Sequence, residues 1–335
     1  MDSISKSRTQ NALGGGVPPS AIPAAAYRLS PHAKNARLMQ RTNLALKPYL
    51  FLLPTLLLLG FWLYRPLVST IYYSFTKWSM LPGTEPVWVG LTNYSKLIGS
   101  KDFGIAVINT GFYIAALLPF SVAIPLVLAN ITNSMKGKAK NIYRTIFFFP
   151  MIMAGVSTST IFRWLLNPGT GLVNVVLNQL GLVKGSISFF TQAETAKWAI
   201  LFITGWKMIG FSTVIFSAAL TSVDKSYYEA ASLDGASKHR RFFDFTVPLI
   251  SPTILFMVMM SILFASQWTF AYIDILTQGG PYGTSTNIYY EMYKYGFSSM
   301  NVGMSSAAAN MFLAVFGIIA IALTAVSKKL AFYDN

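Results

Sequence analysis

The sequence of 335 residues contains no cysteine and only two histidines, His32 and His239. Without cysteine, the chain can form no disulfide, no thiolate metal site and no thiol nucleophile. Because both histidines lie in polar segments, we do not expect a histidine-rich metal site. The sequence also lacks a phosphate-binding loop ending in Gly-Lys-Ser or Gly-Lys-Thr, so we expect the chain to bind no ATP of its own. No group of residues suggests a catalytic site, and the chain is not expected to be an enzyme.

Charged residues are scarce, at 11% of the chain, whereas hydrophobic residues make up 53%. Soluble domains average about 25% charged residues, so this composition indicates a membrane protein. Six apolar runs, each long enough to cross a bilayer, are separated by polar segments. They cover residues 49–75, 105–131, 146–166, 196–220, 249–276 and 304–326. The sequence thus predicts an all-α integral membrane protein with six transmembrane helices.

The net charge of +15 is distributed unevenly along the chain. Of the 26 lysine and arginine residues, 17 lie before the first run, at 132–145, at 222–248 or after the last run. Because basic segments tend to stay on the cytoplasmic side of a membrane, both termini are predicted to be cytoplasmic, and no nucleic-acid partner is needed. Residues 1–44 are rich in Gly, Pro, Ser and Ala, so we expect a mostly disordered cytoplasmic tail that orients the chain or binds a partner. Residues 45–335 are expected to form the transmembrane domain.

A polar segment between the fourth and fifth runs, residues 222–248, is here called the knob. Ser226 and Glu229 have the spacing of a capping box, so a helix is expected to begin at Ser226. Gly235 can adopt the left-handed conformation that ends such a helix and turns the chain. Three phenylalanines then give a second short segment an apolar side, and Pro248 suits the first turn of the next helix. The pattern predicts a helix–turn–helix with a small, partly apolar face that docks into another protein.

The knob resembles the EAA loop of binding-protein-dependent ABC transporter permeases. That motif reads Glu-Ala-Ala, two residues, Asp-Gly-Ala, five residues, Phe, five residues, Pro. The matching residues here are Glu229, Ala230, Ala231, Asp234, Gly235, Ala236, Phe242 and Pro248. A second segment, Leu276-Thr277-Gln278-Gly279-Gly280-Pro281, is similar to the outer-loop signature of the carbohydrate branch of that family, the maltose and glycerol-phosphate type.

The resemblance implies the type I ABC importer permease fold, in the bacterial inner membrane, with alternating access to its two sides. It implies import of a sugar or polyol, delivered by a periplasmic solute-binding protein that meets the outer loops. It further implies a second permease chain and two ATP-binding cassette ATPase subunits, which hold the ATP and Mg²⁺. The knob would be the coupling helix, seated in a groove of the ATPase. The residues assigned to this contact are Tyr228, Glu229, Ala230, Ala231, Asp234, Gly235, Ala236, Phe242 and Pro248.

Several alternatives remain open from the residues alone. Glu229 can pair with a basic group of the ATPase or cap its own helix. Asp234 can brace the following turn or pair with Lys238, Arg240 or Arg241. The importer can carry a peptide, an amino acid or an anionic solute instead of a neutral sugar. A stand-alone secondary transporter and a non-transporting receptor or scaffold are two further interpretations.

The substrate path is expected among the apolar runs, where an ionisable side chain is costly to insert. Lys207 lies 11 residues into the fourth run, which is close to mid-bilayer by helix rise. Its amine can face a substrate cavity, pair with a carboxylate or extend to the membrane surface. The other candidate lining residues are Phe211, Ser266, Gln267, Thr269 and Asn109. Aromatic faces with hydrogen-bonding groups suit a sugar ring, although Ser266 and Thr269 can equally hydrogen-bond between helices.

Overall fold

The computed structural model describes residues 48–135 and 137–330. The chain divides into two compact units, residues 1–65 and 66–335, and each is described by itself. The expected cytoplasmic tail, residues 1–44, lies outside the described residues.

In the first unit, residues 48–65 are helical and include a π-helical turn, η1 (Gly60–Tyr64). All of these residues are exposed, and most of them are large and apolar. The helix continues along the chain as α2 (Arg65–Ser74), so Pro48–Ser74 forms one apolar helix of 27 residues. An apolar helix of this length suits the hydrocarbon core of a bilayer.

Five helices in the described part of the chain are long and apolar enough to cross a membrane, and a bent helix pair makes a sixth candidate. The five are Pro48–Ser74, Lys101–Ser134, Ala193–Ser222, Ser251–Thr277 and Val302–Val326. Lys101–Ser134 joins α4 (Lys101–Leu118), η2 (Pro119–Ala123) and α5 (Ile124–Ser134). Ala193–Ser222 is α9, Ser251–Thr277 joins α13 (Ser251–Tyr272) to η4 (Ile273–Thr277), and Val302–Val326 lies within α15 (Val302–Leu330). The expectation of an all-α membrane protein is confirmed, with the bent pair standing in the place of the third span.

The sequence predicted one continuous helix over the third apolar run, residues 146–166. In the structure this run is broken. It is divided into α6 (Lys138–Ile152) and α7 (Gly155–Leu165), which meet at an angle of 98°. Pro150 removes a backbone donor in the last turn of α6, and the two residues after that helix are extended. An added Cβ atom at Gly155 would lie 3.3 Å from the Cβ atom of Ala271, so the glycine lets α7 approach α13 closely. A hydropathy profile does not reveal such a break, because α6 and α7 are both apolar.

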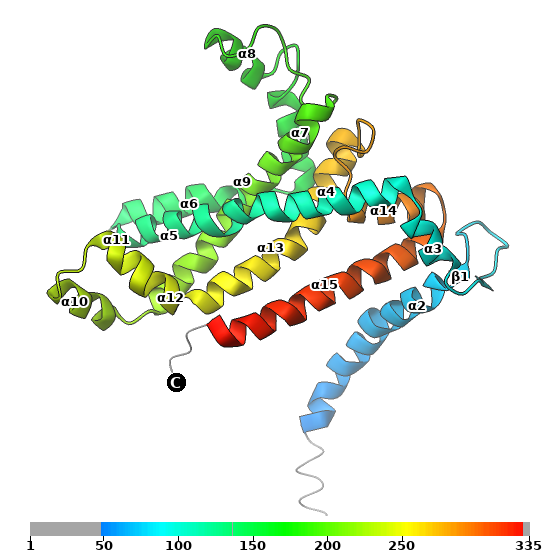
Figure 1. Cartoon of the computed structure of the whole chain (residues 1–335), viewed down its shortest axis with the longest axis horizontal. Helices are drawn as coiled ribbons and strands as arrows, with labels where there is room; N and C mark the ends of the chain where they lie inside the picture. The colour runs from blue at the N-terminus through cyan, green and yellow to red at the C-terminus, as the bar shows by residue number, and fades with distance from the viewer. Residues whose placement is uncertain (1–47, 136, 331–335) are drawn as a thin grey trace, which may run out of the picture. The chain divides into compact units, whose positions relative to one another are not determined.

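Helix α9 packs against α4, α5, α6, η2 and α13 (Figure 1). Glycines allow this close packing. An added Cβ atom at Gly205 would lie 2.6 Å from the ring of Phe120, and one at Gly210 would collide with the carbonyl oxygen of Phe147. Two buried apolar clusters follow the helix. They contain Tyr113, Leu117, Ile200, Ile203, Met208 and Tyr272 in one, and Leu126, Phe216, Leu220, Ile250 and Met257 in the other.

Short elements occupy three of the polar segments between the apolar runs. Strand β1 (Thr76–Lys77) pairs antiparallel with β2 (Val87–Trp88), and α3 (Thr92–Ile98) follows. Helix α8 (Leu172–Gln179) follows α7, while α14 (Ile288–Tyr293) and η5 (Lys294–Ser298) precede α15. These elements are too short to leave a clear hydrophobic period in the sequence.

Candidate functional site

The first helix of the knob, α10 (Lys225–Leu233), has its N-cap two residues earlier than the sequence pattern suggested. Its N-cap is Asp224, whose carboxylate accepts a hydrogen bond from the backbone N–H of Ser226 at 2.9 Å. Hydrogen bonding to the backbone and side chain of Ser226 lowers the pKa of Asp224. The prediction that Ser226 caps this helix is therefore wrong, and Glu229 does not occupy the matching position of a capping box. Glu229 is exposed.

The turn after α10 has the conformation that the sequence predicted. Gly235 has a φ angle of 75°, in the left-handed region. Its N–H donates to the carbonyl of Ser232 at 3.2 Å, and the N–H of Ala236 donates to the carbonyl of Ala231 at 2.9 Å. This pair of bonds is a Schellman motif, which satisfies the last carbonyls of the helix and fixes the direction of the chain beyond it.

The second arm of the knob consists of α11 (Lys238–Arg240), η3 (Arg241–Thr246) and α12 (Val247–Leu249). The hydroxyl of Ser237 caps it by accepting a hydrogen bond from the N–H of Arg240 at 3.2 Å. Arg240 in turn forms an exposed ion pair with Asp244 at 3.1 Å. Among the described residues, no ion pair joins Asp234 to Lys238, Arg240 or Arg241. Asp234 is the C-cap of α10, and its backbone N–H donates to the carbonyl oxygen of Ala230. Pro248 lies in α12, and α13 begins with Ser251.

One face of the knob attaches it to the spans. The hydroxyl of Tyr228 lies 3.2 Å from that of Thr246, which links the two arms. Ala231 is only 3% exposed, and Phe242 packs against the apolar cluster that contains Phe216 at the end of α9. Phe242 therefore holds the knob against the spans, and the Tyr228 contact holds its two arms together.

The opposite face of the knob is exposed. Glu229, Ala230, Asp234 and Gly235 all lie there. Leu233, in the last turn of α10, is 90% exposed, which is unusual for a leucine and was not predicted. Small side chains beside one exposed leucine form a surface on which another protein can pack closely.

Lys207 lies at the break between α6 and α7. Its amine donates a hydrogen bond to the carbonyl oxygen of Met153 at 2.8 Å and lies 5.9 Å from the centre of the Trp268 ring. The residue after α6 has no helical partner for its carbonyl, so the lysine satisfies a group that the bend leaves free. In the described part of the chain, no carboxylate pairs with Lys207.

Phe211 is part of an aromatic cluster that shares Trp268 with Lys207. Its ring meets those of Phe264 and Trp268 edge-on at 5.6 and 5.8 Å, and the last two rings stack at 4.5 Å. The structure therefore brings together Lys207 and Phe211, which the sequence suggested as lining residues, through one tryptophan of α13.

Ser266 and Thr269 are fully buried, and both interact with Asn287. The amide nitrogen of Asn287 donates to the carbonyl of Ser266 at 2.8 Å and to the hydroxyl of Thr269 at 2.7 Å. Gln267 is exposed on another side of the helix. This geometry favours the alternative of hydrogen bonding between elements, and substrate contact by these three residues stays a prediction.

A second cation, near the start of α9, was missed. The amine of Lys197, near the start of α9, donates to the Oδ1 atom of Asn109 at 2.9 Å and lies 4.6 Å from the centre of the Phe112 ring. Asn109 also donates to the carbonyl oxygen of Gly283 at 2.9 Å. The position of Lys197 at the start of an apolar run was the sequence signal that could have identified it. Within the described residues, no group of three His, Asp or Glu side chains is arranged to hold a metal ion.

Comparison with known proteins gives consistent matches. Residues 101–331 match the model of a family described as binding-protein-dependent transport system inner membrane component. A probable ABC transporter permease protein of Pyrococcus horikoshii is 34% identical over 79% of this chain and 91% of its own length. The sn-glycerol-3-phosphate transport system permease protein UgpA of Yersinia pestis is 29% identical over 85% and 95%. A similar chain occurs in the crystal structure of a bacterial alginate ABC transporter in complex with an alginate pentasaccharide-bound periplasmic protein. The two chains are 26% identical and superpose with a TM-score of 0.76, over 88% of this chain and 98% of the other.

Proposed function

The chain belongs to the family of binding-protein-dependent transport system inner membrane components, and from that membership we infer that it imports a sugar or polyol as a permease subunit. It is a membrane transport subunit, not an enzyme. The permease domain extends in this proposal from residue 45 to residue 335, and residues 1–44 form a cytoplasmic tail.

The substrate class is supported by two independent features. Relatives that match most of the chain are described as transporting sn-glycerol-3-phosphate or alginate. The segment Leu276–Pro281 carries the signature that resembles the carbohydrate branch. Glycerol phosphate is anionic, and a cation at Lys207 suits an anionic sugar derivative as well as a neutral one. An importer for a peptide or another anionic solute is the alternative.

The observation that carries the coupling role is the two-faced knob. Phe242 packs the knob against the spans and Tyr228 links its two arms, while Glu229, Ala230 and the turn at Gly235 remain open to a partner. In this proposal two ATP-binding cassette subunits hold ATP and Mg²⁺, and one of them receives the exposed face. A second permease chain, identical or different, completes the pathway.

The proposed mechanism is alternating access. ATP binding closes the ATPase pair, draws the two knobs together and opens the spans toward the periplasm, where a loaded binding protein releases its solute. Hydrolysis returns the spans to the inward-open state. Since an equilibrium shifts only through differential interactions, the ATPases act on the membrane states through their contacts with the knobs. A stand-alone secondary transporter leaves the exposed knob without a role.

The test is uptake and ATP hydrolysis in proteoliposomes that contain the full chain with its co-expressed membrane and ATPase subunits. A panel of binding proteins loaded with different sugars is added from outside. Stimulation of both activities by one loaded binding protein is expected, and it identifies the substrate. Solute movement by this chain alone, without ATP, would replace the importer with a secondary transporter.

A further inference from the structure

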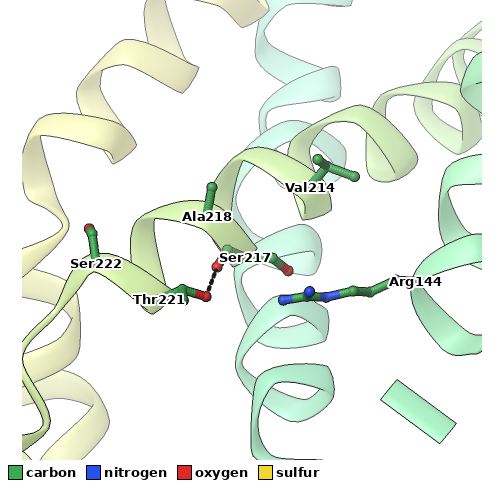
Figure 2. Close-up of a pocket in the computed structure, with 6 residues that line it drawn as sticks. All are labelled: Arg144, Val214, Ser217, Ala218, Thr221 and Ser222. Atoms are coloured by element: carbon green, nitrogen blue, oxygen red, sulfur yellow. Dashed lines mark hydrogen bonds between the residues drawn. The ribbon is translucent and has the colours of Figure 1, made fainter. Parts of the chain in front are cut away.

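A pocket of about 530 Å³ lies between α6 and the last turns of α9. Arg144 supplies one wall, and the other is formed by Val214, Ser217, Ala218, Thr221 and Ser222. Figure 2 shows the arginine side chain reaching toward Ser217 and Thr221 on α9. The pocket is separate from the aromatic cluster around Lys207 and from the exposed face of the knob.

Two buried polar groups in this pocket have no hydrogen-bond partner among the residues that the structure describes. The Nε atom of Arg144 is buried without a hydrogen bond, and so is the hydroxyl of Ser217, a residue that is 4% exposed. Thr221 directs its own hydroxyl to the carbonyl oxygen of Ser217 at 2.7 Å. Among the described residues, neither of the two ion pairs involves Arg144. Because an unsatisfied buried donor is destabilising, and a charged one more so, the pocket is suited to a ligand with anionic oxygens.

The position of the pocket limits which ligand can reach it. Arg144 lies six residues after the start of α6, about 9 Å along the helix axis. Thr221 and Ser222 are the last two residues of α9, and the knob begins at Ser222. In the topology proposed above, both ends lie at the cytoplasmic membrane surface, beside Lys138 and Lys140. Exposed apolar residues on α6, Ile142 and Ile146 among them, extend into the hydrocarbon.

The geometry points to a phosphate-binding site, in which the guanidinium of Arg144 and the hydroxyl of Ser217 hold the phosphate of an anionic phospholipid. Arginine binds phosphate oxygens through several charge-assisted hydrogen bonds. Val214 and Ala218 line the same pocket with apolar surface, which suits the glycerol backbone and the start of an acyl chain. The choice of cytoplasmic leaflet depends on the proposed topology, whereas the phosphate contact does not depend on the transported solute.

The experiment uses the full chain, purified with its co-expressed partner subunits. Native mass spectrometry counts the phospholipids retained after addition of phosphatidylglycerol or phosphatidylcholine, and thermal unfolding is measured with each lipid and with millimolar inorganic phosphate. The variants are Arg144→Gln, Arg144→Lys and Ser217→Ala. Lys138→Gln is the matched control, since Lys138 lies on the same helix, carries the same charge and is exposed outside the pocket.

We expect Arg144→Gln to reduce retention of phosphatidylglycerol by about tenfold, the loss of one charge-assisted contact, while Lys138→Gln changes it less than about twofold. Arg144→Lys should retain part of the binding. Stabilisation by inorganic phosphate that needs Arg144, without lipid retention, would keep the phosphate site and assign it to a soluble ligand.

Equal retention by the native chain and Arg144→Gln, with no effect of inorganic phosphate, would overturn the proposal. So would a native complex that prefers neither lipid and does not respond to phosphate, because another group, such as a carboxylate of a partner subunit, would then occupy Arg144. Should Arg144→Gln fail to insert, Ser217→Ala decides: reduced retention of phosphatidylglycerol supports the site, and unchanged retention overturns it.

Discussion

The knob and the spans satisfy their polar groups in different ways. In the knob the partners are close in sequence: Asp224 accepts from Ser226, Gly235 donates to Ser232, and Arg240 pairs with Asp244. In the spans, hydroxyl groups such as that of Thr204 bond within their own helix, but the lysine and asparagine side chains have partners far away in the sequence. Lys207 reaches Met153 across 54 positions, Lys197 reaches Asn109 across 88, and Asn109 reaches Gly283 across 174. The knob is thus a locally specified module, whereas these lysine and asparagine contacts of the spans depend on the packing of the whole domain.

The largest effect is expected from breaking the turn of the knob. Proline at position 235 cannot adopt a φ angle of 75° and has no N–H to donate to Ser232, so Gly235→Pro should redirect the second arm. We expect ATP-driven uptake to fall by at least about tenfold, the loss of one strong interaction, while the chain still inserts. Uptake in proteoliposomes, with membrane insertion checked by fractionation, measures this.

The chain offers a matched control for that substitution. Gly181, after α8, has a φ angle of 69°, and its N–H and that of Leu182 donate to Asn178 and Leu177 in the same arrangement. Gly181→Pro imposes the same backbone conflict outside the knob and should leave coupled uptake within about threefold of the native value. Equal losses from the two substitutions would mean that the turn at Gly235 has no special part in coupling.

Ala230→Leu, which enlarges the exposed face, should also uncouple transport.

The next effect concerns Lys207, whose amine can either attract an anionic solute or serve only to satisfy the backbone at the bend. Lys207→Met removes the charge and the hydrogen bond to Met153, whereas Lys207→Arg keeps a positive donor. If the amine attracts an anionic solute, Lys207→Met should lower the affinity for uptake of that solute by about tenfold, the value of one charge-assisted bond, and Lys207→Arg by less. For a neutral sugar both variants should behave alike. Concentration-dependent uptake separates these outcomes, and equal affinities in all three proteins for an anionic solute would leave the lysine a structural role alone.

A smaller effect distinguishes Ser266 from its neighbour Asn287. Asn287→Ala removes two hydrogen bonds to α13 and should destabilise the protein by about 1–3 kcal/mol. Ser266→Ala removes a buried hydroxyl that bonds to no group in the described part of the chain, so thermal stability should be unchanged or slightly higher. Thermal unfolding in detergent compares the two. A fall in uptake by Ser266→Ala without any change in stability would instead assign that hydroxyl to the substrate path.

The smallest effect is the pH dependence of the helix cap in the knob. The hydrogen bonds from Ser226 lower the pKa of Asp224 in the folded state, so the cap stabilises the helix above the ordinary pKa of aspartate. That contribution is lost as the pH falls through the lowered value. Coupled ATPase activity should therefore show no transition from this group between about pH 6 and pH 8, since aspartate titrates near 4. Asp224→Ala should weaken coupling, and Asp224→Asn, which still offers an oxygen, should weaken it less; a neutral-pH transition abolished by Asp224→Asn would contradict the assignment.

Much of the knob could be predicted from the sequence because its signals are local. A glycine in the left-handed region has a recognisable place at the end of a helix, and Gly235 has that place. The cap was misassigned because both Asp224 and Ser226 are suitable residue types, and only the backbone conformation decides between them. The exposure of Leu233 could not be predicted, since it depends on which face of α10 the spans cover.

The spans were predicted in number and approximate extent, because a long apolar run has few other uses. Their internal contacts were not. The bend between α6 and α7 depends on an extended pair of residues and on the small side chains that let α13 approach Gly155. Asn287, which holds Ser266 and Thr269, lies in a connection with no apolar period to mark it. Contacts between positions so distant are set by the tertiary arrangement, which a local pattern does not encode.

The contact between Gly210 and the backbone at Phe147 has a mechanical consequence. Because no side chain separates the two backbones at this point, sliding α9 along α6 would bring larger side chains of α9 against the backbone of α6. The two helices are therefore expected to move together. Only Val223 and Asp224 separate the end of α9 from the start of α10. With 30 residues, α9 is about 45 Å long, so a tilt of a few degrees at the knob displaces its far end by several ångströms. In the proposed importer, a small displacement at the knob would therefore produce a larger displacement at the far end of α9, on the other side of the membrane.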